Sequence, residues 1–83
     1  MKRITLYTWP HCPFCAKAKR LLDDKGYTYN DVNIYGDNDK KKKLTELTGQ
    51  TTVPYIFLDH TLLGGCAELE NAMDTGRFDE MVE

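Results

Sequence analysis

The apolar and polar positions of the chain recur in short segments, which predict an alternation of strands and helices. Over residues 2–8, Ile4 and Leu6 alternate with polar or aromatic neighbours, as in a strand with one buried face. From residue 14 onward the apolar side chains instead share an arc of about 120° on a helical wheel. They are Phe14, Cys15, Ala18, Leu21 and Leu22. The first part of the chain therefore predicts a strand and then an amphipathic helix, which ends at Gly26.

The middle of the chain predicts a second strand and a second helix. Residues 27–34 mix tyrosine, threonine, valine and isoleucine, which favour strands. Asp37 or Asn38 is placed to cap a helix that runs to Thr48, where Gly49 follows. The apolar residues of this helix are chiefly Leu44 and Leu47. Because its apolar face is so thin, we expect the helix to lie on the surface.

The last third of the chain predicts a hairpin and a third helix. Residues 55–58 form a continuous apolar run, and residues 59–60 fit a two-residue turn into residues 61–63. After two glycines, apolar residues recur at the spacing of a helix face, which Gly76 ends. They are Leu69, Ala72 and Met73. Residues 78–82 fit one last short turn. The whole pattern predicts an α/β fold, with a small mixed sheet of four strands and helices on its faces.

Composition narrows the class of protein. The 83 residues suffice for one domain, over 1–83, with no room for a second core. The net charge of −2 gives no general attraction to nucleic acid. No apolar run approaches the roughly 18 residues of a membrane span, and the N-terminus lacks the apolar core of a signal peptide. Three cysteines are too few for a secreted disulfide framework, so we expect a cytoplasmic protein.

Two of the cysteines, Cys12 and Cys15, are three positions apart at the predicted start of the first helix. That spacing alone fits either a redox dithiol or a metal site. A zinc site normally takes four such ligands, and no second pair of this spacing is present. Pro13 suits a first helical turn, since its missing N–H has no partner there. The sequence therefore favours a redox dithiol.

The position of each thiol predicts its role. Free N–H groups and the helix dipole stabilise an anion at Cys12, so we expect a thiolate at neutral pH, whereas a free cysteine has a pKa of about 8.5. Lys19 lies four residues after Cys15 on the same side, and we expect its positive charge to favour this thiolate further. Cys15 sits at the edge of the apolar arc. Cys12 is thus the predicted exposed nucleophile and Cys15 the partly buried resolving thiol.

Three segments together closely resemble the dithiol glutaredoxins, specifically the short bacterial type. They are Cys12-Pro13-Phe14-Cys15, Thr51-Thr52-Val53-Pro54-Tyr55-Ile56-Phe57 and Leu63-Gly64-Gly65-Cys66. The resemblance extends over essentially the whole chain. It implies a thioredoxin fold, a cis bond between Val53 and Pro54 that faces the thiols, and a groove for glutathione.

Matched position by position, the resemblance also implies a set of glutathione contacts. These residues are Phe14, Lys41, Thr52, Val53, Pro54, Gly65, Cys66, Ala67 and Glu68. The backbone of Val53 pairs with the cysteinyl unit, and the N–H groups after Gly65 hold the γ-glutamyl carboxylate at a helix N-terminus. Glu68 meets the γ-glutamyl ammonium, and Lys41 meets the glycine carboxylate.

The implied function is a glutathione-dependent thiol–disulfide oxidoreductase. Glutathione is the reducing cosubstrate, and no cofactor is bound permanently. The implied partners are disulfide-containing or glutathionylated proteins, among them ribonucleotide reductase, and the expected state is a monomer.

Two departures from the family pattern leave alternatives open. Trp9 stands where many glutaredoxins have lysine, and Ala67 where many have Asp or Ser, and each change removes a polar contact to glutathione. One alternative is a glutaredoxin-like electron carrier, reduced by thioredoxin reductase and donating to ribonucleotide reductase. A second is an iron–sulfur carrier, in which Cys12 of two subunits and two glutathiones hold the cluster. Trp9 itself is expected to cap the active-site loop by packing.

Overall fold

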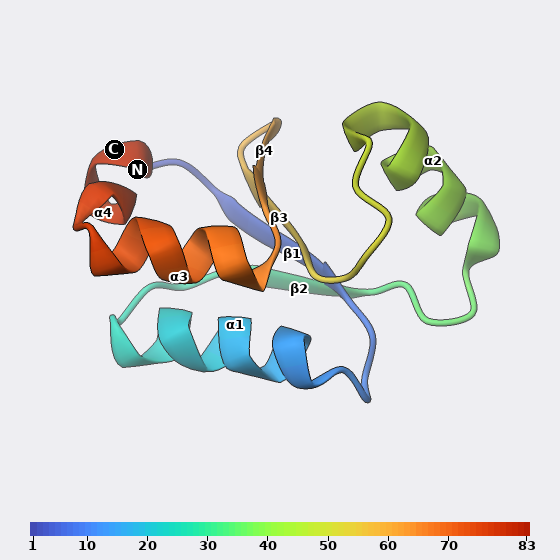
Figure 1. Ribbon diagram of the computed structural model, residues 1–83, viewed down its shortest axis with the longest axis horizontal. Helices are drawn as coiled ribbons and strands as arrows, with labels where there is room; N and C mark the ends of the chain where they lie inside the picture. Colours follow the sequence, from blue (N-terminus) through green and yellow to red (C-terminus); the bar gives the residue numbers. More distant parts are fainter.

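The computed structural model describes residues 1–83 as four strands and four helices (Figure 1). The strands are β1 (Ile4–Thr8), β2 (Asn30–Asn33), β3 (Tyr55–Leu58) and β4 (Thr61–Gly64). The helices are α1 (Pro13–Asp24), α2 (Asn38–Thr48), α3 (Cys66–Asp74) and α4 (Arg77–Met81). The order is the predicted one, and α4 occupies the place of the expected last turn. No helix combines the length and the apolar character that crossing a membrane requires.

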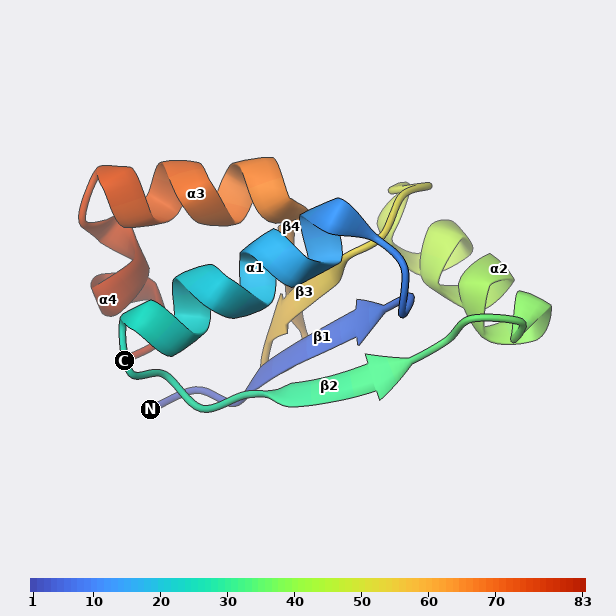
Figure 2. The same cartoon turned by 90° about the horizontal axis from the view of Figure 1, so that it is seen from below.

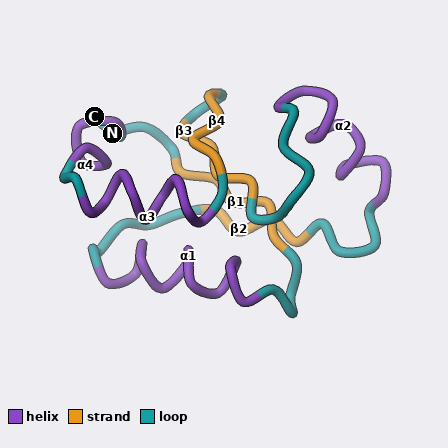
Figure 3. The backbone as a smooth tube through the Cα atoms, viewed as in Figure 1, coloured by secondary structure: helices purple, strands orange, loops and turns teal.

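The strands form one mixed sheet in the order β2-β1-β3-β4. β1 pairs with β2 in parallel and with β3 antiparallel, and β3 pairs antiparallel with β4. Helices α1 and α3 run side by side over one face of this sheet, while α2 lies toward the other (Figures 1 and 2). The backbone trace in Figure 3 shows the loops that follow β1 and precede β3 meeting at one end of the sheet. The expected four-stranded mixed sheet with flanking helices is therefore confirmed.

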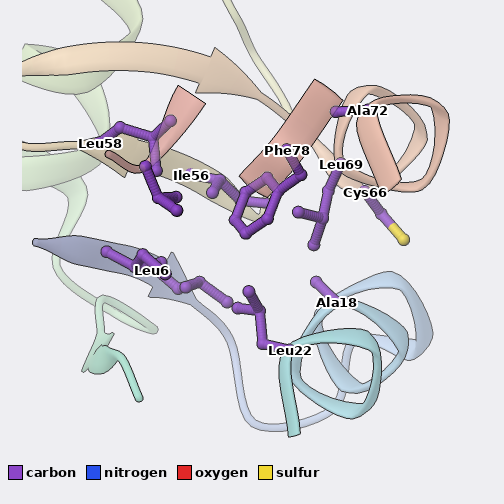
Figure 4. Close-up of a cluster of buried hydrophobic side chains, with 11 residues drawn as sticks. Leu6, Ala18, Leu22, Ile56, Leu58, Cys66, Leu69, Ala72 and Phe78 are labelled. Carbon is purple, nitrogen blue, oxygen red and sulfur yellow. The ribbon is translucent and has the colours of Figure 1, made fainter. Parts of the chain in front are cut away.

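The main core lies between the sheet and the helices α1, α3 and α4 (Figure 4). Its buried residues are Ile4, Leu6, Ala18, Leu22, Ile56, Leu58, Cys66, Leu69, Ala72, Phe78 and Val82. The helical arc predicted from the sequence supplies Ala18 and Leu22. Phe14 belongs to the same arc but is 63% exposed, because it stands in the first turn of α1, where it borders a groove instead of the sheet.

A smaller cluster packs Cys15 and α2 against the sheet. Its buried residues are Cys15, Ile34, Leu44, Val53, Tyr55 and Phe57. The hydroxyl of Tyr55 lies 3.1 Å from that of Thr45 and donates to the carbonyl of Gln50 at 3.0 Å. Leu44 is the buried leucine of α2, whereas Leu47 is 76% exposed. The surface position predicted for α2 is thus correct, although its apolar support is thinner than the sequence suggests.

The second strand is shorter than its sequence predicts. β2 covers Asn30–Asn33, whereas the residue pattern indicates 27–34. The amide of Tyr27 donates to the carbonyl of Leu22 at 3.0 Å, and its hydroxyl donates to Asp79. These contacts hold Tyr27 to the end of α1 and to α4. Because residue 27 is held by α1 and α4, the chain begins to pair with β1 only at Asn30.

Candidate active site

Cys12 is the N-cap residue of α1. Its backbone is extended, with φ −112° and ψ 113°, and Pro13 follows as the first helical residue. The amide of Cys15 donates to Cys12 Sγ at 3.3 Å, so sulfur occupies the place usually taken by a serine or aspartate oxygen. A hydrogen bond and a helix N-terminus both stabilise negative charge. The half-buried sulfur is therefore held at the start of α1 by a backbone N–H and remains accessible.

Cys15 has the opposite surroundings. Its side chain is only 1% exposed and belongs to the cluster between α2 and the sheet. Burial raises the pKa of the Cys15 thiol to about 12, and a hydrogen bond to the Cys12 side chain acts in the same direction. The Trp9 backbone and the charge of Lys19 act more weakly in the lowering direction. At neutral pH Cys15 is therefore a neutral thiol next to the Cys12 sulfur.

A groove of about 330 Å³ lies beside these thiols. The residues that line it are Phe14, Thr52, Val53, Pro54, Gly65, Cys66, Ala67 and Glu68. They come from the first turn of α1, the loop before β3 and the start of α3, three segments that are far apart in the sequence. All eight belong to the set that the sequence predicts for glutathione, and only Lys41 of that set lies outside the lining.

The loop that forms one wall of the groove has a cis peptide bond between Val53 and Pro54, as expected. The side-chain amide of Gln50 donates to the carbonyl of Thr52 at 2.7 Å and to that of Pro54 at 2.9 Å. Sequence reasoning did not single out Gln50, because nothing in the local pattern indicates that an amide would span this loop. The loop is thus fixed by a side chain from just before it.

Comparison with known proteins identifies the family. A protein-family model described as Glutaredoxin matches residues 4–63, which is more than half of the chain. The chain belongs to the glutaredoxin family. Glutaredoxin 3 of Escherichia coli (strain K12) is 35% identical over 83 residues, with 100% of each chain covered. Glutaredoxin 1 of Rickettsia prowazekii (strain Madrid E) is 39% identical over 82 residues, which cover 96% of this chain and 86% of that protein.

A solved structure shows the same fold. The buckwheat glutaredoxin–glutathione complex superposes with a TM-score of 0.90 at 26% identity, covering 98% of this chain and 76% of that chain. This glutaredoxin therefore has the thioredoxin fold that its sequence motifs implied.

Two residues predicted for glutathione have partners within the protein. The ammonium of Lys41 donates to the carbonyl of Thr51 at 2.6 Å and lies 5.7 Å from the centre of the Tyr55 ring. Lys41 thus stands beside the loop that carries Thr52, outside the groove lining. Oε1 of Glu68 accepts from the amide of Gly65 at 2.6 Å, which closes the first turn of α3.

Lys19 is held away from the groove of this glutaredoxin. Its ammonium lies 2.5 Å from Oδ2 of Asp31, and the other oxygen of Asp31 accepts from the Thr8 hydroxyl at 2.5 Å. The charge of Lys19 lowers the pKa of Cys15. We expected Lys19 to favour the Cys12 thiolate. In the structure its ammonium instead pairs with Asp31, and its charge acts on the resolving thiol of Cys15. Sequence reasoning missed Asp31, because the pairing of β1 with β2 brings it to α1.

Trp9 makes an aromatic contact, while its expected role as a cap of the active-site loop stays a prediction. Its ring meets that of Tyr35 edge to face, with 6.1 Å between the centroids. Trp9 precedes α1 and Tyr35 follows β2, so the pair joins two loops at the same end of the sheet. Trp9 remains 38% exposed and Tyr35 67% exposed.

A larger hollow of about 910 Å³ lies elsewhere, between the sheet and α2. Its lining includes Tyr7, Leu47 and Phe57 and no residue of α1. The smaller groove is the candidate active site, because its lining includes Phe14, which stands between Cys12 and Cys15 in the first turn of α1, and Cys66, on whose thiol Cys12 acts.

Proposed function

We propose that this glutaredoxin reduces protein disulfides and protein–glutathione mixed disulfides with glutathione as its reductant. Membership in the family supports a thiol–disulfide oxidoreductase. One observation carries the finer statement: the Cys12 sulfur caps α1 beside a groove whose eight lining residues all match the glutathione set. The solved buckwheat glutaredoxin–glutathione complex, which has the same fold, supports the same ligand. A reducing cytoplasm and a monomeric domain over 1–83 complete the proposal.

The reaction begins at Cys12. Its thiolate attacks one sulfur of the substrate disulfide, and a Cys12–substrate disulfide forms while the other sulfur leaves as a thiolate and takes a proton from solvent. A glutathione thiolate can then attack this intermediate and restore Cys12. Alternatively, Cys15 loses its proton to solvent and attacks Cys12, which releases the bound partner and leaves a Cys12–Cys15 disulfide. Two glutathione molecules reduce that disulfide and leave as glutathione disulfide.

The groove would orient glutathione by its backbone and by the start of α3. The Val53 main chain, fixed next to Pro54, offers an edge that can pair with the cysteinyl unit of glutathione. The N–H groups of Cys66 and Ala67, two lining residues in the first turn of α3, would favour the γ-glutamyl carboxylate. Phe14, with its exposed ring, covers the glutathione thiol. Lys41 attracts the glycine carboxylate from beside the Thr52 loop.

A glutathione-coupled assay on a small mixed disulfide tests this function. We expect Cys12→Ser to abolish turnover, because the attacking sulfur is gone, whereas Cys15→Ser retains much of it, since glutathione resolves the intermediate. Cys66→Ser is the matched control and keeps most of the activity. Equal losses in Cys12→Ser and Cys15→Ser would contradict the assigned roles.

A second candidate rests on Trp9, which packs on Tyr35 at the site where many relatives place a lysine. That substitution removes a charge and so favours a carrier reduced by thioredoxin reductase, one that donates to ribonucleotide reductase. Reduction of the oxidised protein separates the two proposals. Glutathione with its reductase should reduce the Cys12–Cys15 disulfide rapidly, and faster reduction by thioredoxin reductase would favour the second candidate.

A further inference from the structure

A chain of three polar side chains links the sheet to α1 next to Cys15. Thr8 at the end of β1 is only 1% exposed, and its hydroxyl donates to Asp31 of β2 at 2.5 Å. Asp31 in turn holds the ammonium of Lys19 at 2.5 Å. One end of this chain is anchored in the buried sheet, so Lys19 has a fixed position.

Lys19 is placed to act on the resolving thiol. It follows Cys15 by four residues on one helix, a spacing that brings two side chains onto the same face. Among the ionisable groups that act on the Cys15 sulfur, Lys19 is the cation and Cys12 has the opposite effect. Tyr7 and Tyr55 also pack on this cluster, and the ammoniums of Lys40 and Lys41 lie 5.1 Å and 5.7 Å from the centres of their rings. Lys19 therefore offers positive charge to a sulfur that must ionise while buried.

The surroundings of Lys19 keep it charged. The hydrogen bond to Asp31 raises the pKa of Lys19, and the neighbouring hydroxyl of Tyr29 acts in the same direction. Tyr29 in turn faces Asp23, and the groups that raise the pKa of Lys19 are the Asp31 carboxylate, the Tyr29 phenol and the Cys15 thiol. An ammonium in this setting persists well above neutral pH.

Another lysine of the same helix provides an internal comparison. Lys17 also forms an ion pair at 2.5 Å, with Glu70 of α3. Its charge acts on Cys66 and is absent from the groups that act on Cys15. The two lysines thus have similar partners but different neighbouring sulfurs.

We propose that Lys19, positioned by Asp31 and Thr8, stabilises the Cys15 thiolate and so sets the rate of the resolving step. This inference rests on the proposed function. In that step Cys15 releases its proton to solvent, and its sulfur attacks Cys12 Sγ. The Cys12–glutathione bond breaks, the Cys12–Cys15 bond forms, and glutathione leaves as a thiolate that takes up a proton.

A single-turnover reaction with glutathione disulfide resolves the two steps. Reduced protein is mixed with glutathione disulfide, the reaction is quenched with acid, and the mass of the intact protein is measured by mass spectrometry. The first phase is the appearance of protein carrying one glutathione, and the second is its conversion to oxidised protein without glutathione. We expect Lys19→Met to slow the second phase about three- to tenfold at neutral pH and to shift its pH midpoint upward, because an opposite charge has been removed.

Three further variants sharpen the test. Lys19→Arg keeps the charge and should restore most of the second-phase rate. Lys17→Met, the matched control, should change neither phase. Asp31→Ala releases the ammonium and should slow the second phase, by less than Lys19→Met does. An unchanged second phase in Asp31→Ala would overturn the positioning role.

Other outcomes are equally decisive. If Lys19→Met slows the first phase and spares the second, its charge serves Cys12 and the inference fails. If Lys17→Met slows the second phase as much as Lys19→Met does, the effect is one of general surface charge and the inference fails too. Absence of the first phase in the unmodified protein would instead refute the proposed function.

Discussion

Two sulfurs three residues apart in sequence occupy contrasting surroundings. Cys12 accepts the amide hydrogen of Cys15 and stays half-buried, while Cys15 is packed beneath it with 1% exposure. The contrast follows from the helix start, because the cap residue lies outside the first turn and the third residue after it faces the sheet. One sulfur is thus accessible for attack, while the second is a buried thiol that stays protonated at neutral pH.

The protonated state of Cys15 predicts a loss of stability in alkali. Burial raises its pKa from 9.0 to about 12, so its neutral form stabilises the fold fully below about pH 9. That contribution is lost as pH rises through the folded pKa. We expect the free energy of unfolding of the reduced protein to fall between about pH 9 and pH 11 in urea titrations. Cys15→Ala should show a shallower decline, and an identical decline would contradict the assignment.

The two glycines before α3 predict different responses to an added methyl group. Gly64 has φ +137°, and a Cβ there would lie 2.6 Å from Cγ of Glu68. At Gly65 the nearest atom to a Cβ would be 3.4 Å away. We expect Gly64→Ala to lower the free energy of unfolding by about 1–3 kcal/mol. Gly65→Ala should lower it by less than about 1 kcal/mol, and equal losses in urea titrations would contradict the account.

The resemblance to the family predicted most residues of the groove, but it did not predict the residues that hold them in position. The eight groove residues fall in three motifs that the sequence shows plainly. Asp31 and Gln50 lie outside those motifs, and each acts through a contact that exists only after folding. Asp31 reaches α1 because β1 and β2 pair, and Gln50 spans the loop before β3. Such contacts leave no periodic signal in the sequence.

At the scale of elements, α3 begins with a side-chain cap from Glu68, at a helix start that also forms one wall of the groove. Glu68 accepts the amide of Gly65 at 2.6 Å through Oε1. We expect Glu68→Ala to lower the stability by about 1 kcal/mol, because a helix-terminal donor loses its acceptor. Glu68→Gln retains an acceptor oxygen and should keep most of that stability in thermal unfolding. Equal losses in the two variants would attribute the effect to charge instead.

The local sequence predicted where helices begin and end wherever contacts between neighbouring residues determine those ends. Asp37 caps α2 by accepting the amide of Lys40 at 3.0 Å, and Gly49 ends that helix with φ 78°. The start of β2 could not be predicted in the same way. Tyr27 is held by Asp79, which follows it by 52 residues, and no local propensity indicates such a contact.

At the scale of the whole molecule, the C-terminal segment closes the core. The two ends of the chain lie together (Figure 1), and the amide of Lys2 donates to the carbonyl of Val82 at 2.5 Å. Phe78 is 1% exposed and meets the Tyr27 ring edge to face, with 5.1 Å between the centroids. The short helix α4 thus supplies part of the main core, in which side chains of α1 and α3 also pack.

Removing the Phe78 ring should therefore destabilise the whole protein. We expect Phe78→Ala to lower the free energy of unfolding by about 3–5 kcal/mol, since a large cavity opens between α4 and the sheet. Phe78→Leu conserves most of the volume and should lose less than about 1.5 kcal/mol, which keeps a folded variant for urea titration. Met81→Ala, at a partly buried position of α4, is the control. Similar small losses in all three would show that α4 is peripheral.

The central claim is that Cys12 alone is the attacking sulfur. Cys66 is its natural competitor, but Cys66 is 6% exposed and burial raises the pKa of its thiol. The most direct measurement uses Cys15→Ser protein treated with glutathione disulfide, digested under acid and mapped by mass spectrometry. We expect one glutathione, attached to Cys12, and none on Cys66. Glutathione found mainly on Cys66, or no adduct at all, would contradict it.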